Sequence, residues 1–93
     1  MFKKRRGIKL SYAEQGLIHF LCLNADKLGI GIRIRILCID IAHEDWPALF
    51  EVLTNDNVAV YGIAMKYYTN DRKLYTCRKK FYEVFAKEVF KEQ

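Results

Sequence analysis

The sequence contains only three cysteines and two histidines, and it does not group them. Cys22, Cys38 and Cys77 form no CxxC pair and have no histidine at ligand spacing, so a zinc site is not expected. Each cysteine lies among apolar residues, which indicates buried, reduced thiols in a cytoplasmic protein. The sequence therefore predicts a domain that has no metal and no cofactor.

Long hydrophobic runs are also absent. No apolar stretch approaches the roughly 18 residues that a transmembrane helix needs. The opening residues, MFKKRR, resemble the basic start of a signal peptide, but the segment that follows contains Glu14 and lacks a small-residue cleavage site. We therefore expect neither export nor a membrane partner.

Groups of residues that perform catalysis are missing as well. Residues 29–33, GIGIR, lack the Lys-Ser/Thr pair and the preceding strand of a phosphate-binding loop. His19 lies within an apolar run, where a histidine at the edge of the core is expected, and His43 lies in a segment that begins a helix. No two carboxylates have an evident reason to differ in pKa. These absences argue against an enzyme.

What the sequence does contain is a globular composition with an uneven charge. Ninety-three residues, 52% hydrophobic and 14% aromatic, predict one domain spanning 1–93. The net charge is +5, but both ends are basic, whereas residues 11–65 carry more acidic than basic side chains. This division suits a polyanion-binding surface on an acidic scaffold; the alternative is a set of ordinary solvated charges. Residues 1–9 form a short basic arm that we expect to be disordered.

The clearest helix start is Ser11-Tyr-Ala-Glu14, a capping box in which each side chain can bond the backbone amide of the other residue. The helix behind it should end near Asn24 and be followed by a loop over 24–31. Its apolar side is expected to contain Leu17, Ile18, Leu21 and Phe20.

Two further helix starts follow in the middle of the chain. Asp45 can cap a helix that tolerates Pro47 in its first turn and breaks at residues 54–57. Asn57 can cap the next helix, which should extend to about Tyr68.

Residues 30–42, IGIRIRILCIDIA, fit two patterns. Isoleucines alternate with glycine and arginine, which is typical of a strand over 30–41 and would give an α+β domain. From Ile32 onward, Ile36, Leu37 and Ile39 also share a helix face with Ile32 at spacings of three and four. The pattern by itself favours the strand.

Residues 66–81, KYYTNDRKLYTCRKKF, fit either a β-hairpin about Asn70-Asp71 or two helices joined by a turn. A strand needs clean alternation, and Arg78-Lys79-Lys80 would place charge on both faces of a sheet. Apolar residues instead repeat at three and four from Asp71 to Phe90. We therefore expect a helix-turn-helix.

The same region matches the packing pattern of DNA-binding helix-turn-helix motifs. Counted from Val60, the buried positions of the motif fall on Ile63, Tyr67, Leu74 and Cys77. Ala64 occupies the position that must be small because the second helix crosses close above it. Tyr68 falls in the turn, where glycine is usual, which indicates a differently shaped turn.

The residues left facing outward on the second helix suit DNA recognition. Arginine can bind guanine bidentately, and threonine and tyrosine can contact a thymine methyl or a phosphate. The residues expected near bases are Arg72, Tyr75, Thr76 and Lys79. Those expected at phosphates are Lys66, Lys73, Lys80 and the arm residues Lys3, Lys4, Arg5 and Arg6.

Several segments between Leu10 and Phe85 share a recognisable pattern: LSYAEQGLIHFLC, ILCIDIAHEDWPALF, ALFEVLTND, KYYT and KLYTCRKKFYEVF. The pattern resembles small, poorly characterised helix-turn-helix proteins of phages and mobile elements of Gram-positive, clostridium-like bacteria. The resemblance implies a helix over 32–42, although that family has charged residues where this chain has Ile34 and Ile36. These two isoleucines are candidates for a dimer contact. The resemblance overrules the strand, and the expected fold is an all-α domain of five helices with a C-terminal helix-turn-helix.

Two functions follow as hypotheses. The first is a cytoplasmic protein that binds double-stranded DNA, acts in transcription regulation or as a replication accessory, and forms a homodimer on a two-fold site. The second is a phage-encoded module that binds and inhibits a host replication or defence protein, such as one of CRISPR type. Its interface anchors would include Tyr82, Phe90 and Trp46, since aromatic residues concentrate binding energy at interfaces.

Overall fold

The computed structural model describes residues 4–90, and every regular element in this range is helical. Five helices have seven or more residues: α1 Tyr12–Leu23, α3 Gly31–Ala42, α4 Trp46–Thr54, α5 Val60–Lys66 and α6 Asp71–Val89. A single-turn helix, α2 (Ala25–Leu28), and a 3-10 turn, η1 (His43–Asp45), connect them. The expected all-α domain of five helices is confirmed.

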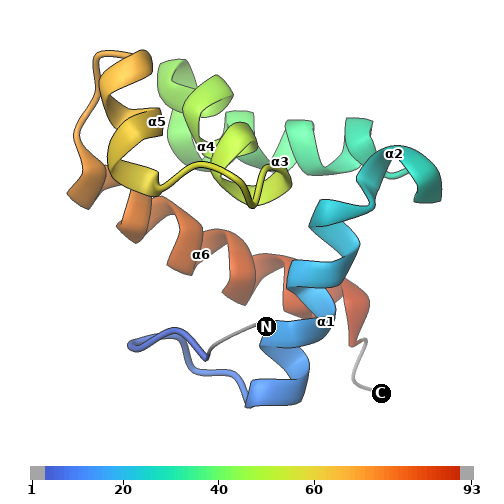
Figure 1. The fold of residues 1–93 in the computed structure, drawn as a ribbon. Coiled ribbons are helices and arrows are strands. Elements are labelled where there is room, and N and C mark those ends of the chain that lie inside the picture. The colour runs from blue at the N-terminus through green and yellow to red at the C-terminus, as the bar shows by residue number, and fades with distance from the viewer. Residues whose placement is uncertain (1–3, 91–93) are drawn as a thin grey trace.

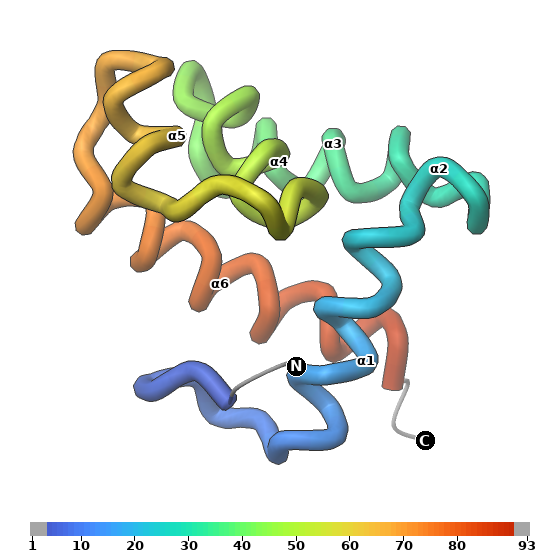
Figure 2. Tube along the Cα trace, in the orientation of Figure 1, coloured from blue at the N-terminus to red at the C-terminus, as the bar shows by residue number. Residues whose placement is uncertain are grey.

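Helix α6 is the longest helix and packs against most of the others. It runs along the length of the fold, with α3, α4 and α5 on one side and the N-terminal segment on the other (Figures 1 and 2). It packs against α1, α3, α4 and α5, because its apolar residues recur at three and four over five turns. The side chains that it buries are Leu74, Cys77, Phe81, Tyr82, Phe85 and Ala86.

Residues 30–42, whose sequence fits both a strand and a helix, contain helix α3, so the strand alternative is wrong. Its buried residues include Ile34, Leu37 and Cys38, which share one helix face. The apolar face expected from the sequence was also wrong, because Ile32 and Ile36 are exposed, as is Ile39. Since both faces of this helix are rich in isoleucine, the pattern did not show which one meets the core.

Helix α1 begins as predicted but turns a different face inward. The capping box is present: the Ser11 amide donates to Glu14 Oε1 at 2.8 Å, and the Glu14 amide donates to Ser11 Oγ at 3.1 Å. The buried side chains are Gln15, Ile18 and Cys22. The expected placement of Leu17 and Phe20 against the core is wrong, since both are exposed; they are part of the outward face of α1 described below.

Two of the expected helix caps are not made. Asp45 precedes α4, and Pro47 lies in the first turn as predicted, but the Asp45 carboxylate bonds Lys73 of α6 instead of capping. Helix α5 starts after Ala59, two residues later than expected, and has no side-chain cap. Asn57 lies in the preceding loop, where its amide donates to Asn55 Oδ1 at 2.9 Å.

The cysteines and histidines take the places expected of them. Cys22, Cys38 and Cys77 are buried free thiols, and burial raises the pKa of Cys22 and of Cys38 to about 12. His19 is half-buried, with its Nε2 atom 3.9 Å from Asp56 Oδ1. Within residues 4–90 no group of three or more metal-binding side chains is present. No helix in this range is long and apolar enough to cross a membrane.

Candidate nucleic-acid interface

Helices α5 and α6 pack as the helix-turn-helix pattern predicts. Ile63 and Ala64 of α5 are buried, as are Leu74 and Cys77 of α6, and Tyr67 is half-buried. Ala64 has only 4% of its surface exposed, which agrees with the need for a small residue where the helices approach closely. The packing of this motif was therefore predicted from the sequence.

The turn between the two helices has a tyrosine in a left-handed conformation. Tyr68 has φ of 56°, and its amide donates to the Met65 carbonyl at 3.2 Å, while the Thr69 amide donates to the Ala64 carbonyl at 2.9 Å. These two bonds define a Schellman motif, whose left-handed position is usually glycine. Asn70 then caps α6, since its Oδ1 atom accepts from the Arg72 amide at 2.7 Å. The turn thus fixes where α6 begins.

The outward face of α6 is exposed as predicted. Its exposed residues in the first three turns are Arg72, Lys73, Tyr75, Thr76, Lys79 and Lys80. Together they place four cations, one hydroxyl group and one phenol along the N-terminal half of a 19-residue helix. This combination can supply both phosphate contacts and contacts to base edges.

Two of the lysines expected at phosphates already have partners within the chain. Lys66 Nζ lies 2.9 Å from Glu51 Oε1, which also accepts from the Tyr67 hydroxyl at 2.8 Å. Lys73 Nζ bonds the carboxylate of Asp45. These hydrogen bonds raise the pKa of both lysines. The charges of Lys66 and Lys73 are therefore offset by carboxylates, whereas no ion pair is formed by Arg72, Lys79 or Lys80 within residues 4–90.

The basic arm is docked on the fold over residues 4–10, so the expectation of disorder is wrong for this part. Gln15, fully buried in α1, binds its backbone. Gln15 Oε1 accepts from the Arg5 amide at 2.8 Å, and Nε2 donates to the carbonyls of Arg5 at 3.3 Å and Leu10 at 3.2 Å. Ile8 is buried in the core. Lys3 lies outside the described residues.

Docking brings the arm beside the exposed face of α6. A groove of about 220 Å³ lies between them, and its lining residues are Arg5, Arg6, Ile8, Tyr75, Thr76, Arg78 and Lys79. The structure thus joins Arg5 and Arg6 to three of the four residues expected near bases. The sequence analysis missed this juxtaposition, because the contact between arm and helix depends on Gln15, which looks like an ordinary helix residue.

Arg78 is the functional candidate that the sequence analysis did not find. Its Cζ atom lies 5.1 Å from the centre of the Tyr75 ring, while Arg5 Cζ lies 5.6 Å from the centre of the Tyr82 ring. Arg5 Nη1 also donates to the Tyr82 hydroxyl at 3.3 Å. Burial, and then the charge of Arg5, lower the pKa of Arg78 to about 10. The sequence does contain a pattern that could have pointed to Arg78, since Tyr75 lies three residues before it and Tyr82 four residues after it.

The three expected protein-interface anchors behave differently. Tyr82 is wrong as an anchor, because only 2% of its surface is exposed; it packs in the core with its hydroxyl toward Arg5. Trp46 is half-buried and makes an edge contact with Phe50, with ring centres 6.3 Å apart. Phe90 is half-buried at the end of α6.

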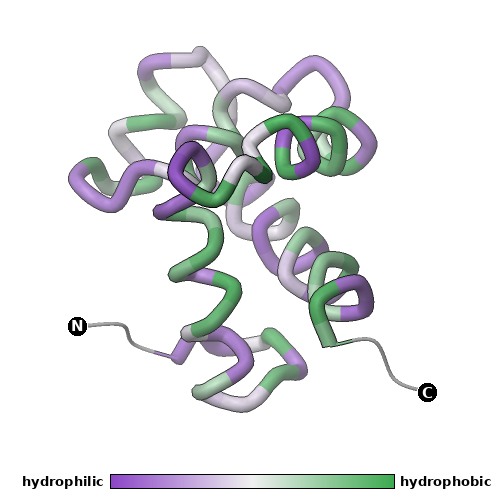
Figure 3. The backbone as a smooth tube through the Cα atoms, turned by 90° about the vertical axis from the view of Figure 1, so that its right-hand side faces the viewer, coloured by the Kyte–Doolittle hydropathy of each residue, from purple (hydrophilic) through white to green (hydrophobic). Residues whose placement is uncertain are grey.

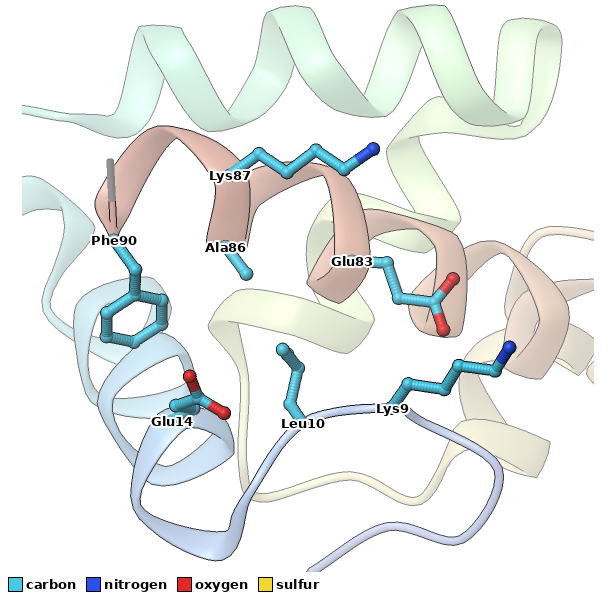
Figure 4. Close-up of a pocket in the computed structure, with 7 residues that line it drawn as sticks. All are labelled: Lys9, Leu10, Glu14, Glu83, Ala86, Lys87 and Phe90. Carbon is cyan, nitrogen blue, oxygen red and sulfur yellow. The ribbon is translucent and has the colours of Figure 1, made fainter. Parts of the chain in front are cut away.

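A cavity larger than the arm–α6 groove lies at Phe90, away from the basic face. It measures about 560 Å³, and Figure 4 shows its lining side chains, which come from the arm, α1 and α6. These are Lys9, Leu10, Glu14, Glu83, Ala86, Lys87 and Phe90. Two acidic and two basic groups share this lining, so it favours no ion of either sign. The arm–α6 groove is smaller but has cations of one sign.

Comparisons with known proteins do not identify a family for this chain. No family model, curated protein or solved structure matches the chain. The resemblance to small helix-turn-helix proteins of mobile elements therefore stays a prediction.

Proposed function

We propose that the protein is a small helix-turn-helix protein of a phage or mobile element that binds double-stranded DNA, in transcription regulation or as a replication accessory. The observation that supports this proposal is the continuity of the basic surface. Arg72, Lys79 and Lys80 are exposed on α6, and the docked arm adds Arg5 and Arg6 beside Lys79. A polyanion such as DNA offers many regularly spaced phosphates to such a surface.

In this proposal α6 enters the major groove with its N-terminal half. Arg72 contacts base edges, and Lys79 and Lys80 hold phosphates on either side. The arm contacts the backbone next to α6. Lys66 and Lys73 contribute less than the sequence suggested, because Glu51 and Asp45 offset their charges.

Fluorescence anisotropy of a labelled duplex of random sequence tests this function. At about 50 mM salt we expect binding, and about a hundred-fold weaker binding at about 200 mM salt if about four phosphate contacts form. The double variant Arg72→Ala/Lys79→Ala should lose at least ten-fold in affinity. Lys27→Ala/Arg35→Ala is the matched control: it removes the same two charge types from exposed positions on α2 and α3. Equal losses in both double variants, or no binding at low salt, would contradict the proposal.

A homodimer is the second part of the proposal, and α1 is the surface that best supports it. The outward positions of α1 carry no charged side chain; they are Tyr12, Ala13, Gly16, Leu17, Phe20 and Leu23. We refer to these six residues as the α1 face. Figure 3 views the molecule from the side on which α1 lies and shows much of this helix as hydrophobic.

The partner that fits the α1 face is a second copy of this chain. Tyr12 and Phe20 lie one turn before and one turn after Gly16, so an antiparallel pair related by a two-fold axis at Gly16 places each Tyr12 opposite the Phe20 of the other copy. Glycine lets two helix backbones approach closely. Because each copy carries a net charge of +5, a contact free of charged residues also avoids the strongest like-charge repulsion.

A protein-binding module remains the alternative function, and the same uncharged face is the observation that favours it. In that case the occupant of the α1 face is a host protein and not a second copy. A chain that neither binds the duplex nor self-associates would support this alternative over both parts of the proposal.

A further inference from the structure

The arm–α6 groove differs from the other cavities of the molecule in its charge. Its lining includes Arg5, Arg6, Arg78 and Lys79, and no carboxylate is among the described residues that line it. Three other cavities of the described chain each have both acidic and basic side chains in their lining. Four cations around about 220 Å³ repel one another, and an anion bound among them would remove that repulsion.

Arg78 is the centre of this arrangement. It is half-buried, and its guanidinium lies against the Tyr75 ring. No carboxylate in residues 4–90 forms an ion pair with it. No buried side-chain nitrogen or oxygen in the described chain is unsatisfied, so the Arg78 donors that make no protein bond are not fully enclosed. A partly desolvated arginine with such donors is suited to a ligand that accepts in-plane, paired hydrogen bonds.

The neighbouring groups match one class of ligand. Phosphate oxygens accept bidentate bonds from a guanidinium more strongly than neutral acceptors do. Thr76 adds a hydroxyl donor, and Lys79 adds a mobile ammonium group at the same rim. The groove is smaller than the roughly 300–1,000 Å³ of pockets that enclose whole small molecules, so it fits a phosphate group and not an entire nucleotide.

We propose that the arm–α6 groove is a phosphate-binding pocket, in which Arg78, Thr76 and the arm arginines hold one phosphate group. When that group belongs to a nucleic-acid backbone, the inference rests on the proposed DNA-binding function, and the phosphate links the arm to α6. The same chemistry is offered by a free phosphate monoester, such as a mononucleotide whose base stays outside the groove.

The first test uses inorganic phosphate as the probe. Thermal unfolding is followed in sodium phosphate and in sodium chloride at matched ionic strength, for wild type, Arg78→Gln and the control Arg35→Gln. Arg35 is an exposed arginine of α3 outside the groove. We expect phosphate to raise the Tm of wild type and of Arg35→Gln by about 5 °C when its concentration is several times the Kd. Arg78→Gln should show no such shift.

The variant Arg78→Lys distinguishes a loss of phosphate binding from a folding defect. It keeps the positive charge but loses the paired donors, so it should fold and bind phosphate more weakly than wild type. Equal Tm shifts in wild type and Arg78→Gln, or no shift in wild type, would overturn the inference. Neither result would contradict the DNA-binding proposal, whose test measures duplex binding.

The second test separates the two sources of phosphate. Duplex binding is measured against salt for wild type and Arg78→Gln, and AMP replaces inorganic phosphate in the thermal experiment. If the groove holds a backbone phosphate, Arg78→Gln lowers the slope of log K against log salt by about 1. If duplex binding is unchanged but AMP stabilises only proteins that retain Arg78, the natural ligand is a free monoester. Phosphate binding without any duplex binding would support the pocket and refute the proposed function.

Discussion

Tyr68 is one of two non-glycine residues with a positive φ among residues 4–90; the other is His43, with φ of 53°. The Tyr68 φ of 56° lies in the left-handed region, and 98% of the surface of Tyr68 is exposed, so no packing of its side chain accounts for the conformation. For an L-residue with a Cβ atom this region costs roughly 1–2 kcal/mol. The two Schellman bonds of the turn impose it.

Replacing Tyr68 with glycine should therefore stabilise the fold. We expect Tyr68→Gly to raise the free energy of unfolding by roughly 0.5–1 kcal/mol, because glycine adopts this conformation without the steric cost. Urea unfolding followed by circular dichroism measures the change. Tyr61→Gly, at an exposed position inside α5, is the control of opposite sign, with an expected loss of about 0.5 kcal/mol. A loss of stability in both variants would show that the turn is not strained.

At the scale of elements, sequence patterns predicted where the helices lie along the chain better than which side of each helix faces the core. The capping box and the spacing of apolar residues over 71–90 located α1 and α6, because both signals are local. The inward faces of α1 and α3 could not be predicted in the same way, since both helices have apolar residues all round. Asp45 fits an N-cap by sequence, but a lysine on another helix competes for its carboxylate.

The candidate site likewise has a part that local patterns predicted and a part that they did not. The exposed residues of α6 were predictable, because they occupy the face opposite the motif's buried positions. The docked arm and Arg78 were not, since the arm is held by the side chain of Gln15 and the surroundings of Arg78 include Arg5, from the other end of the chain. A charge-rich N-terminus has no local pattern that distinguishes a docked arm from a disordered one.

Gln15 joins the arm to α1, and its replacement should release the arm. In Gln15→Leu the Arg5 amide and the Arg5 and Leu10 carbonyls lose their partner. We expect the free energy of unfolding to fall by about 2 kcal/mol. Amide hydrogen exchange at Arg5 should become fast, whereas Asn57→Leu, in an exposed loop, should leave it slow. Slow exchange at Arg5 in Gln15→Leu would mean that other contacts hold the arm.

At the scale of the whole molecule, charge and apolar surface are separated. The cations gather on the arm and the N-terminal half of α6, whereas the α1 face has none. If the protein binds DNA and dimerises as proposed, the two kinds of contact should respond to salt in opposite directions. Salt weakens DNA binding through counterion competition, and it strengthens a dimer by screening the repulsion of two copies that each carry +5.

Sedimentation equilibrium at about 50 and 500 mM salt tests the dimer. The six residues of the α1 face offer less area than the roughly 800 Å² per partner of a standard interface, so we expect a weak dimer that needs high protein concentration. Dimerisation should increase with salt and be abolished by Phe20→Glu. Ile36→Glu, on the exposed face of α3 and at a position that the sequence suggested for a dimer contact, should remain dimeric. Ile34, the other such position, is buried and cannot serve.

If the dimer persists in Phe20→Glu but dissociates in Ile36→Glu, the dimer interface lies on α3 and not on α1. A wild-type chain that stays monomeric at all concentrations would refute the homodimer.

The way in which Gln15 holds the arm has a consequence for how this protein can diverge. All of its bonds to the arm reach backbone atoms, so the anchorage does not depend on which side chains the arm carries. Exposed arm residues such as Lys4, Arg6 and Lys9 can gain or lose charge while the backbone stays in place. Substitutions in this short segment can therefore change the strength of the proposed polyanion binding while the fold is kept.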